Sequence, residues 1–455
     1  MAAKPKGSRK ARKGTVPAAA AVGTGSALDR FFSLGASGST LATELRAGLA
    51  TFLTMAYIMF VNPAILEQAG MDHGAVFVAT CLAAALGSLI MGLYANYPIA
   101  LAPGMGLNAY FAFTIVPELG GNWQLALGCV FLSGVLFFAL SLSPLRAWLI
   151  DAIPLNLKLG IAAGIGFFLA LIALQNAGIV ADDPTTLVTL GDLAKPQAWL
   201  AVAGFLLIAG LALRKMPGAI IAGVLAVTLA AVALGLEPWR GVTSTPPSLT
   251  PTFLKMDVAG VFQLGLVTIV LTLLLVTILD TAGTLIGVAR QAGLLDRDGR
   301  LPRLRQTLLA DSGSAALGAA LGTSTTTAYI ESAAGVEEGG RTGLTAIVVA
   351  LLFLLSLFVA PLAQTVPLYA TAPALLFVAC LMAASLGAFA WDDPTDYIPA
   401  LIIVLMMPLS YSIATGIGLG FIAYVALKAL AGRFDQINAA VAVIALAFLL
   451  KLIFA

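Results

Sequence analysis

The chain has 455 residues, of which 60% are hydrophobic and only 10% are charged, and its mean hydropathy is +1.00. A soluble domain carries charge on about a quarter of its residues, so this composition excludes a soluble enzyme and indicates a polytopic protein embedded in a lipid bilayer. The formal net charge is only +2, and the chain has one histidine, which lies in a predicted external loop. Its three cysteines all fall inside apolar runs. We therefore expect no metal site, no disulfide, no cofactor and no nucleic-acid partner.

Residues 1–30 differ from the rest because they are basic, rich in small residues and without the apolar core of a signal peptide. They predict a disordered cytoplasmic tail, which places the N-terminus inside by the positive-inside rule. Loops that follow an even number of spans then carry Arg146, Arg214 and Arg290, in agreement with that orientation. We expect a multi-pass protein of the plasma membrane, which is the inner membrane if the source is bacterial.

Apolar runs near the roughly 20 residues that cross a bilayer recur along almost the whole chain. The predicted spans are 44–66, 75–96, 98–118, 122–143, 157–178, 198–213, 217–236, 264–289, 308–322, 323–337, 342–363 and 371–390. Residues 396–455 are expected to hold two or three more. The stretch from Tyr397 to Leu430 is too long for one straight span and contains Pro408, so we expect either a short helix plus a full one or a kinked span.

Two predicted spans are interrupted in related places. The third breaks at "APGMGLNAYF" and the tenth at "LGTSTTTAYIES", and their Ala-Tyr pairs lie about half the chain apart. An odd number of spans per half makes a second repeat run the opposite way, which is the pattern of inverted-repeat transporters. Broken backbone at bilayer depth is tolerated only where protein or a water-filled cavity satisfies it, so the breaks predict a site for a polar solute. The alternative is that Gly104 and Gly106 only permit close helix packing, which leaves Pro103 and Asn108 unexplained.

Two acidic residues are expected to lie deep in the membrane, where charge is costly and so marks function. Asp280 precedes Arg290 by ten residues, about 15 Å of helix, and shares a polar helical face with Thr277, Thr281 and Thr284. Glu331 follows a Ser/Thr run in the broken tenth span. A carboxylate in an apolar site has its ionised form disfavoured, so it can exchange protons and couple them to solute entry. Each could instead be a structural anchor between helices.

Five segments, at 43–66, 91–113, 280–299, 310–346 and 370–378, closely resemble the adenine/hypoxanthine/guanine permeases, the AzgA-like branch of the nucleobase:cation symporters. The first begins "TELRAGLATFLTMAYIMFVNP" and the fourth contains "GTSTTTAYIESAAGVEEGGRTG". The resemblance implies an all-α fold of fourteen spans in two inverted repeats of seven. It also implies core domain parts at 43–143 and 263–363, holding spans 1–4 and 8–11. Gate domain parts are implied at 144–262 and 364–455, holding spans 5–7 and 12–14.

The resemblance also implies the site. The family's acidic residue of the eighth span falls on Asp280, its tenth-span glutamate on Glu331 and its third-span asparagine on Asn108. Leu279 departs from the family's usual Phe. We expect Glu331 to accept N–H bonds from a purine, and Asp280 to bind substrate or carry the proton. The remaining candidates are the donors Ser324, Thr325 and Thr326 and, as stacking rings, Phe52, Phe111 and Tyr110.

The sequence and the resemblance together predict a transporter, not an enzyme, that imports hypoxanthine, guanine or adenine by proton symport. Na⁺ is the less favoured coupling ion, because two lone carboxylates suit a proton better than a sodium cage. An anion exchanger or channel on the same fold is the main alternative, although two deep carboxylates would repel an anion. A membrane sensor or scaffold that does not transport, and a homodimeric assembly, are left open.

Overall fold

The chain was analysed as a computed structural model that describes residues 27–143, 152–263, 266–294 and 301–454. Most of the predicted N-terminal tail and the loops that carry Arg146 and Arg297 lie outside the described residues. Eight helical segments of the described residues are long and apolar enough to cross a membrane, and four shorter apolar helices accompany them. The prediction of an all-α polytopic membrane protein is therefore confirmed.

The first seven membrane segments run from α2 to α11. Their elements are α2 (Leu41–Met55) with α3 (Ile58–Glu67), α4 (His73–Ile90) with η1 (Met91–Ala95), β1 (Leu101–Pro103) with α5 (Met105–Tyr110), η2 (Phe111–Ile115) and α6 (Val116–Glu118), α7 (Trp123–Ser141), α9 (Leu155–Asn176), α10 (Pro196–Leu213) and α11 (Ala219–Ala233). Side chains cap several of these helices. Thr40 accepts a hydrogen bond from the Thr43 N–H, and Asp72 accepts one from the Ala75 N–H.

The second seven segments repeat this order in the opposite sense through the membrane. They are α13 (Val267–Gln291), α14 (Leu304–Leu321), β4 (Thr326–Ala328) with α15 (Ser332–Glu337), α16 (Gly343–Ser356) with η3 (Leu357–Val359) and α17 (Ala360–Thr365), α18 (Leu368–Ala383) with η4 (Ala384–Ala388), α19 (Pro394–Leu409) and α20 (Ile413–Leu430). The breaks predicted in the third and tenth spans are thus present, each as a short strand followed by a helix.

Six further elements of the described residues lie outside the two repeats. They are α1 (Ala27–Phe32), the hairpin β2 (Val180–Asp183) and β3 (Leu187–Leu190), α12 (Val258–Gln263), η5 (Phe434–Gln436) and α21 (Ala439–Phe454). The stretch around Pro408 confirms the first of the two sequence expectations, a short helix plus a full one. It forms two helices of 16 and 18 residues, α19 and α20, that pack on one another. The turn between them is made at Tyr411, whose φ is +53°.

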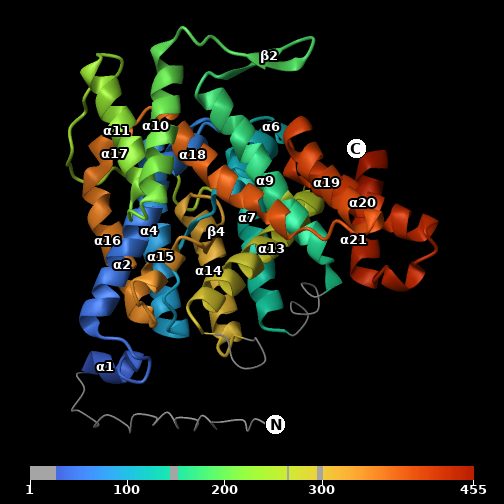
Figure 1. Cartoon of the computed structure of the whole chain (residues 1–455), viewed down its shortest axis with the longest axis horizontal. Coiled ribbons are helices and arrows are strands. Elements are labelled where there is room, and N and C mark those ends of the chain that lie inside the picture. The colour runs from blue at the N-terminus through green and yellow to red at the C-terminus, as the bar shows by residue number, and fades with distance from the viewer. Residues whose placement is uncertain (1–26, 144–151, 264–265, 295–300, 455) are drawn as a thin grey trace, which may run out of the picture.

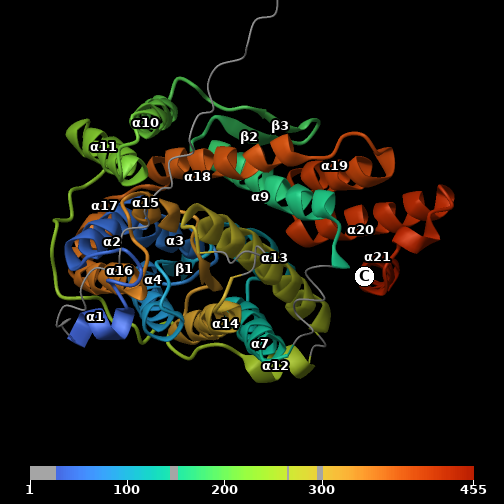
Figure 2. The same cartoon turned by 60° about the horizontal axis from the view of Figure 1, so that its bottom comes forward.

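The helices gather in two groups. Figure 2 shows α9, α10, α11, α18 and α19 on one side, with α2, α3, α4, α7, α13, α14 and α16 packed together on the other. The contacts agree, because α9 packs on α18 and α19 while α14 packs on α7 and α4. This is the core and gate division of the fold. The two interrupted spans belong to the core group, where β4 lies in the middle of the molecule (Figure 1).

Candidate functional site

The two broken spans meet at an antiparallel pair of strands. Within it Leu101 pairs with Ala328, and Pro103 pairs with Thr326. The pairing extends beyond the strands, because the Gly104 N–H donates to the Thr325 carbonyl at 2.9 Å. Each strand thereby supplies partners for backbone groups that a broken helix leaves free, as bilayer depth demands. The start of α5 therefore lies beside Thr325, whereas the start of α15 lies at the other end of the pair, where the Ala100 N–H donates to Ser332 Oγ at 3.0 Å.

Glycines at the crossing also serve close packing. A Cβ on Gly104 would lie 2.8 Å from Thr327 Cγ2, and a Cβ on Gly106 would lie 2.5 Å from Ile165 Cγ2. Both distances are too short for real side chains, so no larger residue fits without movement. The packing explanation weighed from the sequence therefore holds for these two glycines, while the strand pairing accounts for the extended backbone around Pro103.

Glu331 lies at the turn between β4 and α15, where the Tyr57 hydroxyl donates to its Oε1 at 2.8 Å. Tyr57 is fully buried and lies at the break between α2 and α3. The backbone carbonyl of Glu331 accepts a second bond, from Thr54 Oγ1 at 3.3 Å. The first span therefore holds both the side chain and the main chain of Glu331. Sequence reasoning missed Tyr57, since nothing in "TMAYIMF" indicates which helix it faces.

Asp280 is a half-buried residue of α13, which contacts α5, α15 and β4. Its carboxylate interacts electrostatically with those of Asp311 and Glu331, and it has no hydrogen-bond partner among the described residues. The polar face predicted around it is turned inward, because Thr277 and Thr281 are buried. Asp280 and Glu331 thus approach the strand crossing from two different spans.

Asp311 is a third deep carboxylate, so the expectation of only two was wrong. It is fully buried on α14, where Oδ1 accepts the Ala328 N–H at 2.9 Å and Oδ2 accepts the Thr281 hydroxyl at 2.7 Å. It ties β4 to α13. Its position inside the predicted span 308–322 could have revealed it. Glu44 is also fully buried and accepts the Thr345 N–H and hydroxyl, which ties α2 to α16.

Asn108 belongs to a buried amide network. Its Nδ2 donates to Asn62 Oδ1 at 2.6 Å, and its Oδ1 accepts the Ser324 hydroxyl. Asn62 in turn donates to Thr80 at 2.7 Å and to Thr323 at 2.9 Å. The two ends of the Asn108 amide thus join α5 to α3 and to Ser324, which lies two residues before β4. The sequence singled out Asn108 and Ser324 but missed Asn62.

The threonines of the tenth span face different ways, because alternate side chains of a strand point to opposite sides. Thr326 packs against α14, with its Oγ1 2.4 Å from the Cβ position of Gly318 and without a hydrogen-bond partner among the described residues. Thr327 faces α13 instead, and its hydroxyl lies 3.1 Å from that of Thr281. Thr327, which the sequence did not single out, is therefore nearer Asp280's helix than Thr326.

The three candidate stacking rings differ in exposure. Phe111 and Tyr110 are fully buried in the core cluster, whereas Phe52 is half-buried and packs edge-on against Phe353 with ring centroids 5.1 Å apart. Tyr329, next to Ile330 and Glu331 in the chain, donates its hydroxyl to the Pro103 carbonyl at 2.5 Å. Of the three candidates, only Phe52 keeps exposed surface.

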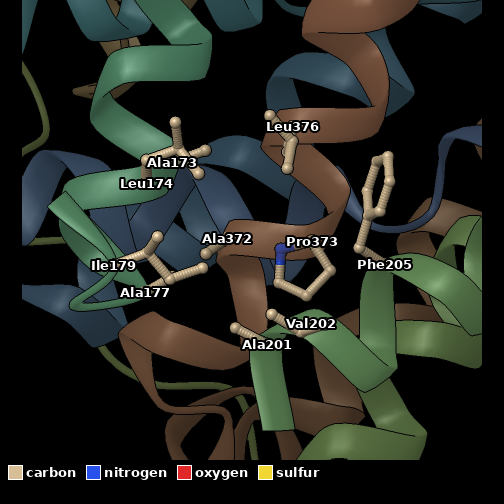
Figure 3. A pocket seen from close by; sticks show the side chains of 10 residues that line it. All are labelled: Ala173, Leu174, Ala177, Ile179, Ala201, Val202, Phe205, Ala372, Pro373 and Leu376. Atoms are coloured by element: carbon tan, nitrogen blue, oxygen red, sulfur yellow. The ribbon is translucent and has the colours of Figure 1, made fainter. Parts of the chain in front are cut away.

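Two cavities lie away from these carboxylates. One is a hollow of about 70 Å³ with apolar side chains from α9, α10 and α18, among them Phe205, Pro373 and Leu376 (Figure 3). It has no group that could orient a polar solute. The other measures about 560 Å³ and is lined by charged and amide side chains near the junction of α3 and α4. Within the described ranges no cluster of three or more potential metal ligands occurs.

Comparison with known proteins gives consistent matches. Residues 42–419 match the Permease family (Xan_ur_permease). The chain is 48% identical to the adenine permease AdeP of Escherichia coli, over 94% of this chain and 96% of that protein. It is 44% identical to the guanine/hypoxanthine permease PbuG of Bacillus subtilis, over 93% and 99%. The transmembrane domain of the cyanobacterial bicarbonate transporter BicA has a TM-score of 0.62 at 17% identity, covering 85% of this chain and 97% of that one.

Proposed function

Because the chain belongs to the Permease family, a family of membrane transporters, we propose that it imports purine nucleobases by proton symport. Relatives named for adenine and for guanine and hypoxanthine support a purine as the substrate. The observation that carries the proposal is the position of Glu331, at the crossing of two broken spans with Asp280 on the neighbouring helix. Such a point near the membrane midplane is where inverted-repeat transporters bind their solutes.

Glu331 accepts N–H groups of the purine ring, and Tyr57 holds the carboxylate in place from the first span. The ring nitrogens and carbonyl oxygens of the purine need donors, for which the hydroxyls of Thr325 and Thr327 remain, because the Ser324 hydroxyl donates to Asn108 and Thr326 packs against α14. Phe52 is the stacking ring with exposed surface, and aromatic faces pair well with flat heterocycles. This arrangement recognises a neutral, planar solute with both donors and acceptors.

Asp280 is the proton carrier in this scheme. The described residues give its carboxylate no hydrogen-bond partner, whereas Glu331 is held by Tyr57 and Asp311 by Thr281 and Ala328. A carboxylate without a fixed donor is the one that can gain and lose a proton as the site opens. Movement of the core group against the gate group then exposes the site to each side of the membrane in turn.

The main alternative is anion transport, because a bicarbonate transporter shares the fold. The likeness at 17% identity concerns the fold alone. Three carboxylates, Asp280, Asp311 and Glu331, interact electrostatically around the crossing and would repel an anion. The site chemistry therefore favours a neutral base.

The test is uptake of radiolabelled hypoxanthine into proteoliposomes under an imposed pH gradient, with excess adenine, guanine, xanthine or uracil as competitor. We expect uptake that the pH gradient drives. Excess purine should inhibit this uptake, and excess uracil should not. Uptake driven equally by a sodium gradient would refute proton coupling. Absence of nucleobase uptake together with chloride or bicarbonate flux would refute the substrate class.

A further inference from the structure

The polar cavity of about 560 Å³ is distinct from the site at the strand crossing. We call this cavity the vestibule. Its polar lining consists of Glu67, Gln68, Asp72, His73, Arg240 and Gln364. These residues come from the ends of α3 and α17, the start of α4 and the loop before α12. The volume lies within the roughly 300–1,000 Å³ of small-molecule sites.

Neighbouring residues hold one charged side chain of the vestibule, Glu67, and the backbone at another residue, Arg240. His73 Nδ1 lies 2.9 Å from Glu67 Oε2, which fixes the carboxylate. The backbone N–H of Arg240 donates to Thr365 Oγ1 at 3.2 Å, which anchors that part of the loop to α17. Asp72 caps the start of α4, because its Oδ1 accepts the Ala75 N–H at 2.7 Å. The Glu67 carboxylate and the backbone at Arg240 are therefore held before any solute arrives, and the Arg240 guanidinium extends from this anchored backbone.

The remaining hydrogen-bonding capacity is mixed. The side chains of Arg240 and Gln364 are exposed and have no partner among the described residues, so they offer free donors and one amide acceptor. Glu67 adds a carboxylate acceptor with 60% of its side chain exposed. A bare anion would face Glu67, and a bare cation would face Arg240. A neutral solute with donors and acceptors on one plane fits both.

The vestibule and the central site share a helix. Tyr57, which holds Glu331, immediately precedes α3, and Glu67 ends it ten residues later, about 15 Å along the axis. Resting on the proposed function, we propose that the vestibule is a second, weaker nucleobase site in which a purine docks at the mouth of the transporter before it reaches Glu331.

Transport kinetics test this proposal. The variants Arg240→Ala and Gln364→Ala each remove one hydrogen-bonding group, so we expect the half-saturation concentration for hypoxanthine to rise about five-fold with the maximal rate unchanged. Because the vestibule lies at one end of the bundle, the rise should occur in intact cells or in inverted vesicles, but not in both. Arg214→Ala, at an exposed arginine after α10, is the matched control and should change neither value.

Photolabelling with 8-azidoadenine locates the second site directly. In the Glu331→Gln protein, we expect labelled peptides from residues 64–74 or 364–368. Excess hypoxanthine should reduce this labelling. Adding both Arg240→Ala and Gln364→Ala to the protein should abolish it. Unchanged half-saturation in both variants, an equal rise from both sides, or labelling that chloride competes but hypoxanthine does not would each overturn the proposal. Absence of purine transport in the unmodified protein would instead overturn the proposed function.

Discussion

The Tyr57 hydroxyl and the Glu331 carboxylate form a 2.8 Å hydrogen bond across 274 positions of the sequence. Each residue lies where its own span is interrupted, Tyr57 between α2 and α3 and Glu331 between β4 and α15. The bond therefore joins breaks in the first and second repeats. It fixes the direction in which the carboxylate points, which is a requirement for reading the N–H edge of a solute.

Tyr57→Phe removes this donor while keeping the ring and its packing. A hydrogen bond to a charged group contributes about 1.5–3 kcal/mol, so loss of orientation should raise the half-saturation concentration for hypoxanthine at least ten-fold. Uptake kinetics in proteoliposomes measure this effect. Tyr424→Phe, in α20, is the control and should leave half-saturation unchanged. An unaltered value in the Tyr57 variant would mean that Glu331 is oriented by other groups.

Asp311→Asn tests whether the third carboxylate is a positioning residue. The change keeps the size of the side chain but removes the acceptor for either the Ala328 N–H or the Thr281 hydroxyl. We expect a loss of about 1–3 kcal/mol in the free energy of unfolding, seen as a lower melting temperature in detergent, together with reduced uptake. Ser312→Ala is the neighbouring control, since the Ser312 hydroxyl bonds only its own helix. A melting temperature equal to that of wild type would contradict the role.

Gly104→Ala tests the closeness of the strand crossing. The new methyl group would lie 2.8 Å from Thr327 Cγ2, so β1 and β4 must separate. Overpacking of this kind costs about 1–3 kcal/mol, and we expect both the melting temperature and the uptake rate to fall. Gly210→Ala in α10 is the matched control, because nothing lies within 4 Å of its Cβ position. If the two alanine variants behaved alike, the crossing would be looser than described.

Much of this site follows from the sequence, and the remainder depends on packing. The irregular residues of "APGMGLN" and "TSTTTAY" indicate broken spans on their own, and Asp280 and Glu331 stand out because charge is rare in apolar runs. Tyr57 is an ordinary residue of a membrane helix until its neighbour is known. The side of β4 on which Thr326 lies depends on strand register, which a Ser/Thr run leaves undefined.

Asp311 shows the same limit from another direction. It lies in a predicted span and carries a charge, so composition alone could have identified it as a deep residue. Its partners, the Ala328 N–H and the Thr281 hydroxyl, come from two other spans. Its role in holding β4 to α13 therefore appears only once the spans are assembled.

A fourth prediction concerns pH and Asp393, which caps the start of α19. Hydrogen bonds from Thr395, together with Arg433 and Lys428, lower the pKa of Asp393 to about 2. Because the pKa is lower in the folded state, the stabilisation is present above the ordinary value of 3.8 and is lost as pH falls toward 2. Asp393→Asn should therefore lower the melting temperature by a constant amount at pH 5–8, and the difference should shrink below about pH 4.

Thermal unfolding in detergent across this pH range measures the effect. Asp392→Asn changes an exposed neighbouring carboxylate and serves as the control. A difference between Asp393→Asn and wild type that stays constant down to pH 3 would show that the effect does not come from the charge of Asp393.

The central claim is that the carboxylates beside the strand crossing form the purine site. Equilibrium binding of radiolabelled hypoxanthine to the purified protein tests it most directly, with Glu331→Gln compared against Glu338→Gln, an exposed glutamate just after α15. We predict saturable binding in wild type and in Glu338→Gln, and binding weakened about 100-fold or more in Glu331→Gln, as expected when a charged hydrogen-bond acceptor is lost. Equal affinity in all three folded proteins would contradict the account.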